Sequence, residues 1–112
     1  LLGVVHRPFH GETYWGWVGT GVSASLRAAL KHDPHDPVPR IIVSLSHKGE
    51  VESVVKAAIP DAEVISGAGA GYKVLKVLDN TAQAYVHTTK IKKWDLCAGN
   101  ALLDAAGGRM ST

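Results

Sequence analysis

The sequence predicts a layered α/β fold in which an antiparallel strand meander precedes a series of βα units. Residues 1–18 hold two short apolar and aromatic segments around a turn, which is the pattern of a hairpin. From residue 40 onward, short apolar runs alternate with segments of helical periodicity. We therefore expect a meander over residues 1–31, a Pro-rich connection over 32–39 and an α/β portion over 40–112.

The meander begins with two segments rich in branched and aromatic residues, 1–6 (LLGVVH) and 13–18 (TYWGWV), with Gly11 between them. They are expected to pair as a hairpin. A glycine turn at 19–21 leads to residues 22–27, which we expect to form a third, edge strand. A meander of this kind normally extends a larger sheet, so its edges should be exposed and a homo-oligomer is possible.

The connection HDPHDPVP contains His32, Asp33, His35 and Asp36, which raises the question of a metal site. The prolines at 34 and 37 prevent the helical spacing that would place both histidines on one face. We expect an extended, solvated loop here.

The α/β portion alternates strand and helix patterns. Strands are expected at residues 41–44, 62–65 and 84–87, and helices over 51–59, over 70–78 and from the first turn that holds Asp95. Repeated βα units imply helices packed on a sheet, with the site in the loops at the strand ends.

The last helix lies in the stretch 92–108 (KKWDLCAGNALLDAAGG). One face carries apolar or small residues, while two leucines lie off it, so we expect the helix to be covered on two sides. The face comprises Trp94, Ala98, Ala101, Leu102 and Ala105, and the two leucines are Leu96 and Leu103. Gly107 and Gly108 should end the helix. Cys97 is expected to be a small core residue and has no cysteine with which to form an intrachain disulfide.

Asp95 lies in the first turn of this helix, where unpaired backbone N–H groups favour a negative charge. The position suits either a helix cap or a metal ligand, and a lone carboxylate does not by itself specify a metal.

Two loops that follow strands carry polar chemistry. Ser44, Ser46 and His47 follow the first strand and could bind a ligand, or Ser46 could cap the next helix with His47 merely exposed. A hydrolase triad is discounted because the chain has no GxSxG motif. The second loop, SGAGAGYK, places Gly69 and Lys73 at a helix start, where a phosphate would fit. A simple tight turn is the alternative.

Composition restricts the function further. Twelve basic and ten acidic residues give a net charge of +2, too small to indicate nucleic-acid binding. No apolar run reaches the roughly 20 residues of a membrane span, and no signal peptide is apparent. The chain lacks an initiator Met and begins within an apolar run, so we expect it to be the C-terminal part of a longer protein.

The motif that starts with Trp94, Asp95, Ala98 and Gly99 and ends in Ala-Gly-Gly resembles the second signature of the inositol monophosphatase superfamily. The segments SLSH, GAGYK and KKWDLCAGNA resemble its 3′(2′),5′-bisphosphate nucleotidase branch, and LLGVVHRPF, AGYKVL and IKKWDLCAGNALL are most similar to the Golgi-resident members of that branch. The similarity covers nearly all of the 112 residues and is least in the Pro-rich connection.

This resemblance implies the C-terminal portion of a layered αβαβα, sugar-phosphatase-like fold. It implies a Mg²⁺-dependent phosphatase that removes the 3′-phosphate of adenosine 3′,5′-bisphosphate, a by-product of sulfotransferases. By the same resemblance Ser44, His47, Gly69 and Lys73 would contact this nucleotide bisphosphate substrate, and Asp95 would bind magnesium. The acidic motifs that hold the other metal ligands and activate water are not in this chain, so it offers no catalytic residue.

Two other functions stay open, an inositol monophosphatase-type phosphatase and a nucleotide-binding module without catalysis. The resemblance implies the Golgi lumen, with the cytoplasm as the alternative, and any membrane anchor would lie upstream of Leu1.

Overall fold

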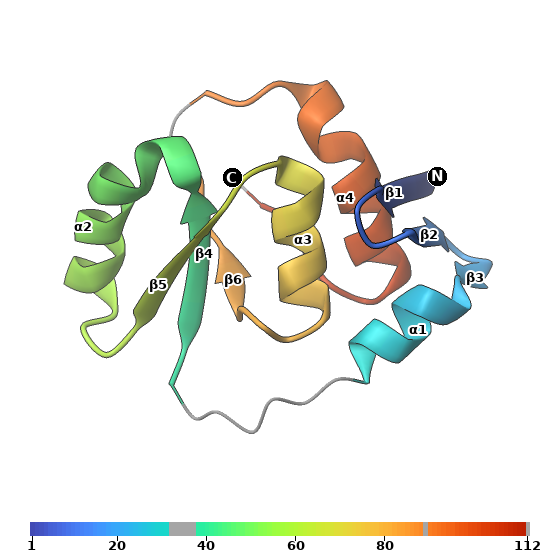
Figure 1. Ribbon diagram of the computed structural model, residues 1–112, viewed down its shortest axis with the longest axis horizontal. Coiled ribbons are helices and arrows are strands. Elements are labelled where there is room, and N and C mark those ends of the chain that lie inside the picture. Colours follow the sequence, from blue (N-terminus) through green and yellow to red (C-terminus); the bar gives the residue numbers. More distant parts are fainter. Residues whose placement is uncertain (32–37, 89, 112) are drawn as a thin grey trace.

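A computed structural model describes residues 1–31, 38–88 and 90–111 (Figure 1). The first sheet contains β1 (Leu2–Arg7), β2 (Glu12–Trp17) and β3 (Gly21–Val22), and the second contains β4 (Arg40–Ser44), β5 (Glu63–Gly67) and β6 (Ala84–Tyr85). The α-helices within the described ranges are α1 (Ala24–Leu30), α2 (Lys48–Ala58), α3 (Ala70–Leu78) and α4 (Lys93–Ala105), with a short 3₁₀ helix, η1, at Leu45–His47. The possible metal site at 32–36 falls outside the described residues, and the boundaries at 31 and 40 stay predictions.

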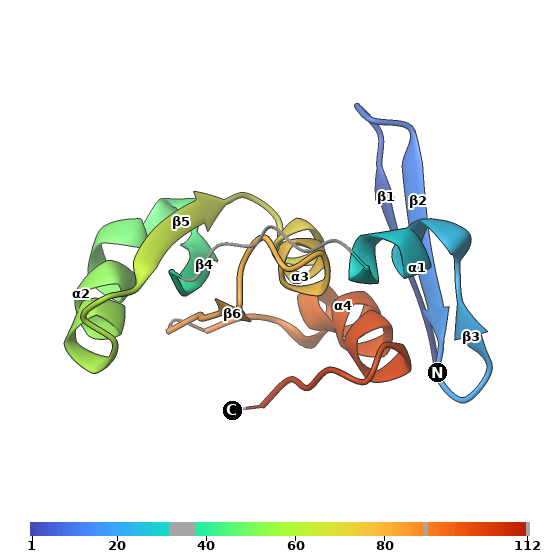
Figure 2. The same ribbon diagram turned by 90° about the horizontal axis from the view of Figure 1, so that it is seen from below.

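The elements form layers. Figure 2 shows α2 outside the second sheet, α3 and α4 in the middle, and the first sheet on the far side. One apolar core joins the two ends of the chain, because Tyr14 and Leu26 share a buried cluster with Leu75 and Leu102. The layered α/β arrangement expected from the sequence is confirmed.

The first sheet is antiparallel in the order β1-β2-β3, with Val4 opposite Trp15, so the predicted hairpin is confirmed. The prediction of an edge strand over 22–27 is wrong, because β3 ends at Val22 and α1 begins at Ala24. Ser23 caps α1: its hydroxyl accepts a hydrogen bond from the Leu26 N–H at 3.2 Å. The segment ASLRAAL then forms a helix that buries Leu26 completely.

The second sheet is parallel in the order β5-β4-β6. Ile42 of β4 lies opposite Ile65 of β5 on one side and Tyr85 of β6 on the other. The chain therefore leaves β4 in one direction and returns on its opposite side, which makes β4 the point where the strand order reverses. Ligands of open α/β sheets bind at the carboxyl ends of strands at such a point.

Helix α4 lies directly on the first sheet. Gly3 and Gly16 are opposite each other in the β1–β2 pair and both face α4. A Cβ added at Gly3 would lie 2.3 Å from the carbonyl oxygen of Ala98, and one at Gly16 would lie 3.0 Å from the Cβ of Ala105. The absence of side chains at these glycines allows the helix to approach the strands closely.

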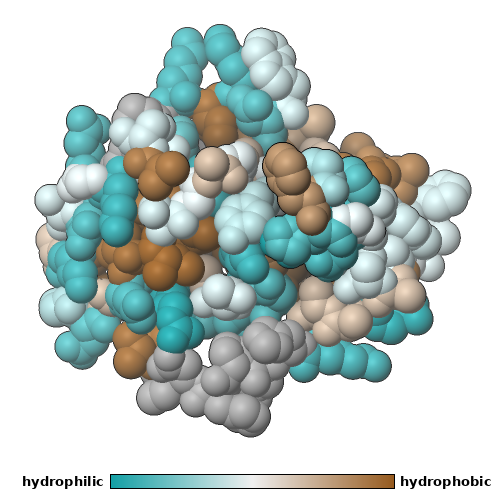
Figure 3. Space-filling model, in the orientation of Figure 1, coloured by the Kyte–Doolittle hydropathy of each residue, from teal (hydrophilic) through white to brown (hydrophobic). Residues whose placement is uncertain are grey.

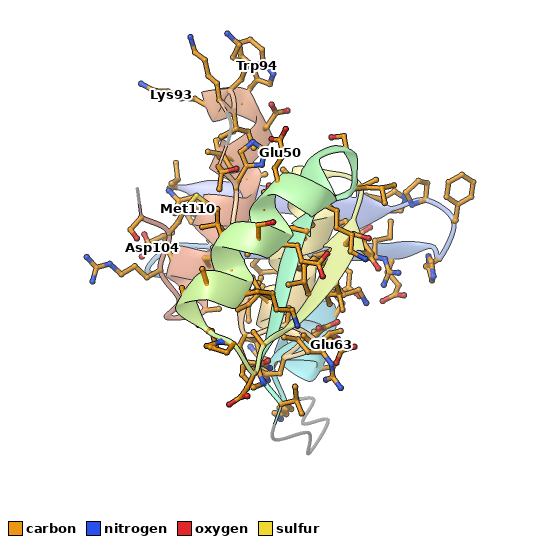
Figure 4. The ribbon with its side chains drawn as sticks, turned by 90° about the vertical axis from the view of Figure 1, so that its left-hand side faces the viewer. Glu50, Glu63, Lys93, Trp94, Asp104 and Met110 are labelled. Atoms are coloured by element: carbon orange, nitrogen blue, oxygen red, sulfur yellow. The ribbon has the colours of Figure 1, made fainter. Side chains whose placement is uncertain are left out.

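The ends of α4 differ in burial. Leu102 and Leu103 are buried, and Gly107 ends the helix with a φ of 85° as expected. The first turn is exposed, and Figure 4 shows Trp94 projecting from it, 75% exposed. The prediction that Cys97 is a core residue is wrong, because the first turns of α4 extend beyond both sheets and leave this thiol exposed.

Part of the apolar surface is uncovered. Val4, Trp15 and Trp17 of the hairpin are exposed, as expected for a sheet that is not covered on its outer face. On the face shown in Figure 3, apolar residues gather over the region of β4 and β5, bordered by hydrophilic residues. Within residues 1–31, 38–88 and 90–111 no helix is long and apolar enough to cross a membrane.

Candidate functional site

A pocket of about 310 Å³ lies where the carboxyl ends of β4 and β6 meet the first turns of α3 and α4. Its volume is at the lower end of the range of small-molecule sites. The pocket is lined by Ser44, Ser46, Gly69, Ala70, Lys73, Tyr85, His87, Lys90, Ile91, Lys92 and Asp95. Four residues that were predicted separately, from two loops and from the start of the last helix, thus line one cavity: Ser44, Gly69, Lys73 and Asp95. For His47 the structure describes the backbone, in η1, but not the side chain.

The hydroxyl side of the pocket comes from the end of β4. The oxygens of Ser44 and Ser46 are 3.2 Å apart and within hydrogen-bonding distance. Both residues line the pocket. Both hydroxyls thus belong to residues that a ligand in this pocket would contact.

The first turn of α3 forms a second side. Gly69 precedes the helix with a φ of 84°, a left-handed conformation that a residue with a side chain adopts only with strain. Among the described residues no side chain caps this helix end, and Gly69 and Ala70 line the cavity. The first-turn N–H groups of α3 are therefore suited to bind an anion.

Lys73 is the most unusual residue of the site, because it is a lysine that is only 3% exposed. Its Nζ lies 4.7 Å from the centroid of the Tyr85 ring. None of the ion pairs among the described residues includes Lys73. Burial lowers the pKa of this ammonium, because the charged form has lost its hydration. A buried cation with no carboxylate partner is a strong attractor for an incoming anion.

Tyr85 and His87 line the pocket but were not identified from the sequence. Their rings meet edge to face, with centroids 6.3 Å apart. The Tyr85 hydroxyl is buried and has no hydrogen-bond partner among the described residues. Burial and, secondarily, the Asp95 charge raise the pKa of Tyr85, so the hydroxyl is protonated at neutral pH. The sequence could have indicated them, because ligands bind at the carboxyl ends of parallel strands and these two residues lie at the end of the predicted third strand.

Asp95 lies exposed in the first turn of α4 and faces the pocket. None of the ion pairs or side-chain hydrogen bonds found among the described residues involves it. The Asp95 carboxylate and the hydroxyls of Ser44 and Ser46, which line the same pocket, are the kind of oxygen donors that Mg²⁺ prefers. Within the described ranges no three His, Cys, Asp or Glu side chains gather closely enough to hold a metal. Asp95 therefore fits one ligand of a magnesium site, and the other ligands would have to come from outside these residues.

The rim of the pocket is cationic. Lys90 and Lys92 line it from the segment between β6 and α4. Lys92 places its Nζ 5.8 Å from the centroid of the Trp94 ring. With Lys73 they make three lysines among the residues that line the cavity, together with one acidic residue, Asp95. This excess of lysines over acidic residues favours a ligand that carries more than one negative charge.

Known proteins resemble the chain over its whole length. The model of the inositol monophosphatase family matches the chain over residues 1–112. The chain is 46% identical to the putative inositol monophosphatase 3 of Drosophila melanogaster, and the alignment covers 100% of this chain and 32% of the fly protein. It is 43% identical to the Golgi-resident adenosine 3′,5′-bisphosphate 3′-phosphatase of Homo sapiens, again over 100% of this chain and 32% of the human protein. The chain spans about a third of the length of these curated relatives.

The fold has a counterpart among solved structures. The crystal structure of inositol monophosphatase II from Staphylococcus aureus superimposes with a TM-score of 0.75, over 98% of this chain and 44% of the bacterial chain, at 20% sequence identity. At this identity the superposition supports the fold alone. The family match over residues 1–112 shows that the chain belongs to the inositol monophosphatase family.

Proposed function

We propose that the complete protein is a Mg²⁺-dependent phosphatase that removes the 3′-phosphate of adenosine 3′,5′-bisphosphate and releases AMP. The observation that carries this proposal is the convergence of the buried Lys73, the start of α3 and Asp95 on one pocket. The name of the human relative, a 3′-phosphatase of that nucleotide, supports the choice of substrate.

Each group would have a separate task. Asp95 would hold one magnesium ion, and magnesium supplies charge neutralisation on the phosphoryl group and activation of water. Lys73 and the N–H groups at the start of α3 would bind the phosphate that is not transferred. Ser44 and His47 would orient the nucleoside. The remaining metal ligands would come from the part of the protein that this chain does not contain.

The charge of the pocket favours a bisphosphate over a monophosphate. Charge on the reacting phosphate would be neutralised by the magnesium that Asp95 helps to hold, so a monophosphate would need few further cations. The pocket is lined by three lysines, Lys73, Lys90 and Lys92, which is more positive charge than one phosphate requires. A second phosphate on the substrate would pair with the additional lysines. The alternative is an inositol phosphate, which is supported by the name of the Drosophila relative.

The test is a comparison of substrates on the complete protein. We expect magnesium-dependent phosphate release from adenosine 3′,5′-bisphosphate, with a kcat/KM at least about tenfold above that for inositol 1-phosphate, because a charge-assisted hydrogen bond to one more phosphate is worth about 1.5–3 kcal/mol. A preference for inositol 1-phosphate would select the alternative. Nucleotide binding without turnover at any magnesium concentration would instead indicate a module without catalysis.

The name of the human relative also suggests a cellular compartment for the protein. The human relative is named as Golgi-resident, and we propose the Golgi lumen for this protein as well. Imaging of the tagged complete protein with a Golgi marker tests this assignment, and a cytoplasmic signal would contradict it.

A further inference from the structure

The hydroxyl of Tyr85 presents an unmet hydrogen-bonding need. Its oxygen is buried and has no hydrogen-bond partner among residues 1–31, 38–88 and 90–111. Tyr14, in contrast, is also buried and donates its hydroxyl to the Glu12 carboxylate. A buried hydroxyl without a partner destabilises a protein, so such groups call for an explanation in terms of a missing ligand, water or partner group.

The surroundings of Tyr85 indicate what the missing partner is. Its ring lies against the Lys73 ammonium, with the Nζ 4.7 Å from the ring centroid, and both residues line the same pocket as Asp95. Lys73 is buried without an ion-pair partner among the described residues. Two adjacent groups, a cation and a protonated hydroxyl, therefore both lack an acceptor. An anion with several oxygen atoms can satisfy the two at once.

We propose that the Tyr85 hydroxyl donates a hydrogen bond to the phosphate group that Lys73 attracts, which makes Tyr85 a substrate-binding residue. This inference rests on the proposed function for the identity of the substrate. Within the pocket Tyr85 then has two tasks: its ring holds the Lys73 ammonium in place by a cation–π contact, and its hydroxyl adds a directed donor.

A hydroxyl that hydrogen-bonds only to substrate and one that stabilises the fold differ in how their removal changes the stability of the free protein. Removal of an unsatisfied buried hydroxyl leaves the free protein as stable as before or more stable, whereas removal of a satisfied one destabilises it. Tyr85→Phe should therefore weaken the binding of phosphate groups without lowering the unfolding temperature. This combination of effects is not expected from a structural tyrosine.

Tyr72→Phe is the matched control. Tyr72 is on α3 next to Lys73. Its ring also makes a cation–π contact with a lysine, with the Lys76 Nζ 5.2 Å from the ring centroid. Tyr72 does not line the pocket of Lys73 and Asp95. The two substitutions remove the same atom from tyrosines with similar ring contacts.

The experiment uses the complete protein and measures three quantities for each variant. They are the KM and kcat for adenosine 3′,5′-bisphosphate, the inhibition constant of inorganic phosphate, and the unfolding temperature without ligand. For Tyr85→Phe we expect KM and the phosphate inhibition constant to rise about tenfold, because the lost bond has a charged acceptor, with an unchanged or higher unfolding temperature. Tyr72→Phe should match the wild type in all three.

Two results would overturn the inference. Tyr85→Phe could bind phosphate as the wild type does, or it could unfold at a lower temperature and change the magnesium dependence alone, which would assign the hydroxyl to the fold or to the metal ligand Asp95. Failure of the proposed function is a separate result, since it appears in the wild type as absence of phosphate release. Weaker binding of inorganic phosphate to Tyr85→Phe would support the anion site even then.

Discussion

The contact between β1 and α4 predicts a large effect for the small substitution Gly3→Ala. The added Cβ would lie 2.3 Å from the Ala98 carbonyl oxygen and 2.8 Å from the Cβ of Ala101. Carbon and oxygen atoms that touch are about 3.3 Å apart or more, so strand and helix must separate by about 1 Å. Backbone atoms cannot turn aside as the end of a flexible side chain can.

Both stability and activity should respond. Overfilling a well-packed core costs about 1–3 kcal/mol, and we expect Gly3→Ala to lie at the upper end because one of the clashing groups is a backbone carbonyl. Asp95 lies on the same helix, so the displacement reaches the candidate metal ligand. A misplacement of about 1 Å at a reacting centre can reduce the rate about 10²-fold.

Denaturant unfolding and phosphate release from adenosine 3′,5′-bisphosphate, both on the complete protein, measure these effects. Gly49→Ala is the control: Gly49 is in α2, and a Cβ there would have nothing within 4 Å. This control should be neutral or stabilising by up to about 1 kcal/mol. If Gly3→Ala unfolded at the same denaturant concentration as the wild type, the close approach of β1 and α4 would be wrong.

Other substitutions and conditions test the site. Asp95→Asn should raise the magnesium concentration needed for activity about tenfold or more with little change in unfolding, since it removes a ligand charge and keeps the size; an unchanged magnesium titration would contradict this. Lys73→Ala should lower kcat/KM for adenosine 3′,5′-bisphosphate more than for adenosine 3′-monophosphate, and equal losses would show that Lys73 does not bind the second phosphate. Burial lowers the pKa of Lys73 below its ordinary 10.5, so between the lowered value and 10.5 the unfolded state binds more protons. As pH rises through that window, the stability of the free protein should rise while its affinity for inorganic phosphate falls, and parallel changes would contradict this assignment. Residues 1–112 alone should release no phosphate and should self-associate in light scattering, because the hairpin exposes Trp15 and Trp17; a stable monomer would contradict the second expectation.

The α/β portion was predictable because its signals are local. Residues 70–78 show helical periodicity and follow a glycine turn, and α3 spans the same residues. In residues 22–27 the local signals competed: the glycine turn and Val22 favoured a strand, whereas Ser23 at the N-cap and the following alanines favoured a helix. The helix formed because it buries Leu26.

The site was predictable as far as it depends on strand ends. Ser44 and Gly69 follow from the rule that ligands bind beyond the carboxyl ends of parallel strands, whereas Asp95 was predicted from its place in the first turn of a helix and from the family resemblance. The contact of Lys73 with Tyr85 was not accessible, because it depends on the directions of two side chains from different elements. The exposure of Cys97 was not accessible either, since a helical pattern does not reveal how far a helix extends beyond the sheet that it covers.

The glycine contacts beneath α4 also restrict how this protein can evolve and be engineered. Repacking of core side chains normally lets a helix settle in a slightly different position, because rotamers offer many alternatives of similar energy. At Gly3 and Gly16, α4 packs against the backbone of the strands, where there is no side chain that could change its rotamer. The helix therefore cannot shift there in the usual way. Variants with altered metal or substrate preference should therefore be sought by randomising the exposed residues 90 and 92–94, while libraries that target the core beneath α4 should return mostly inactive proteins.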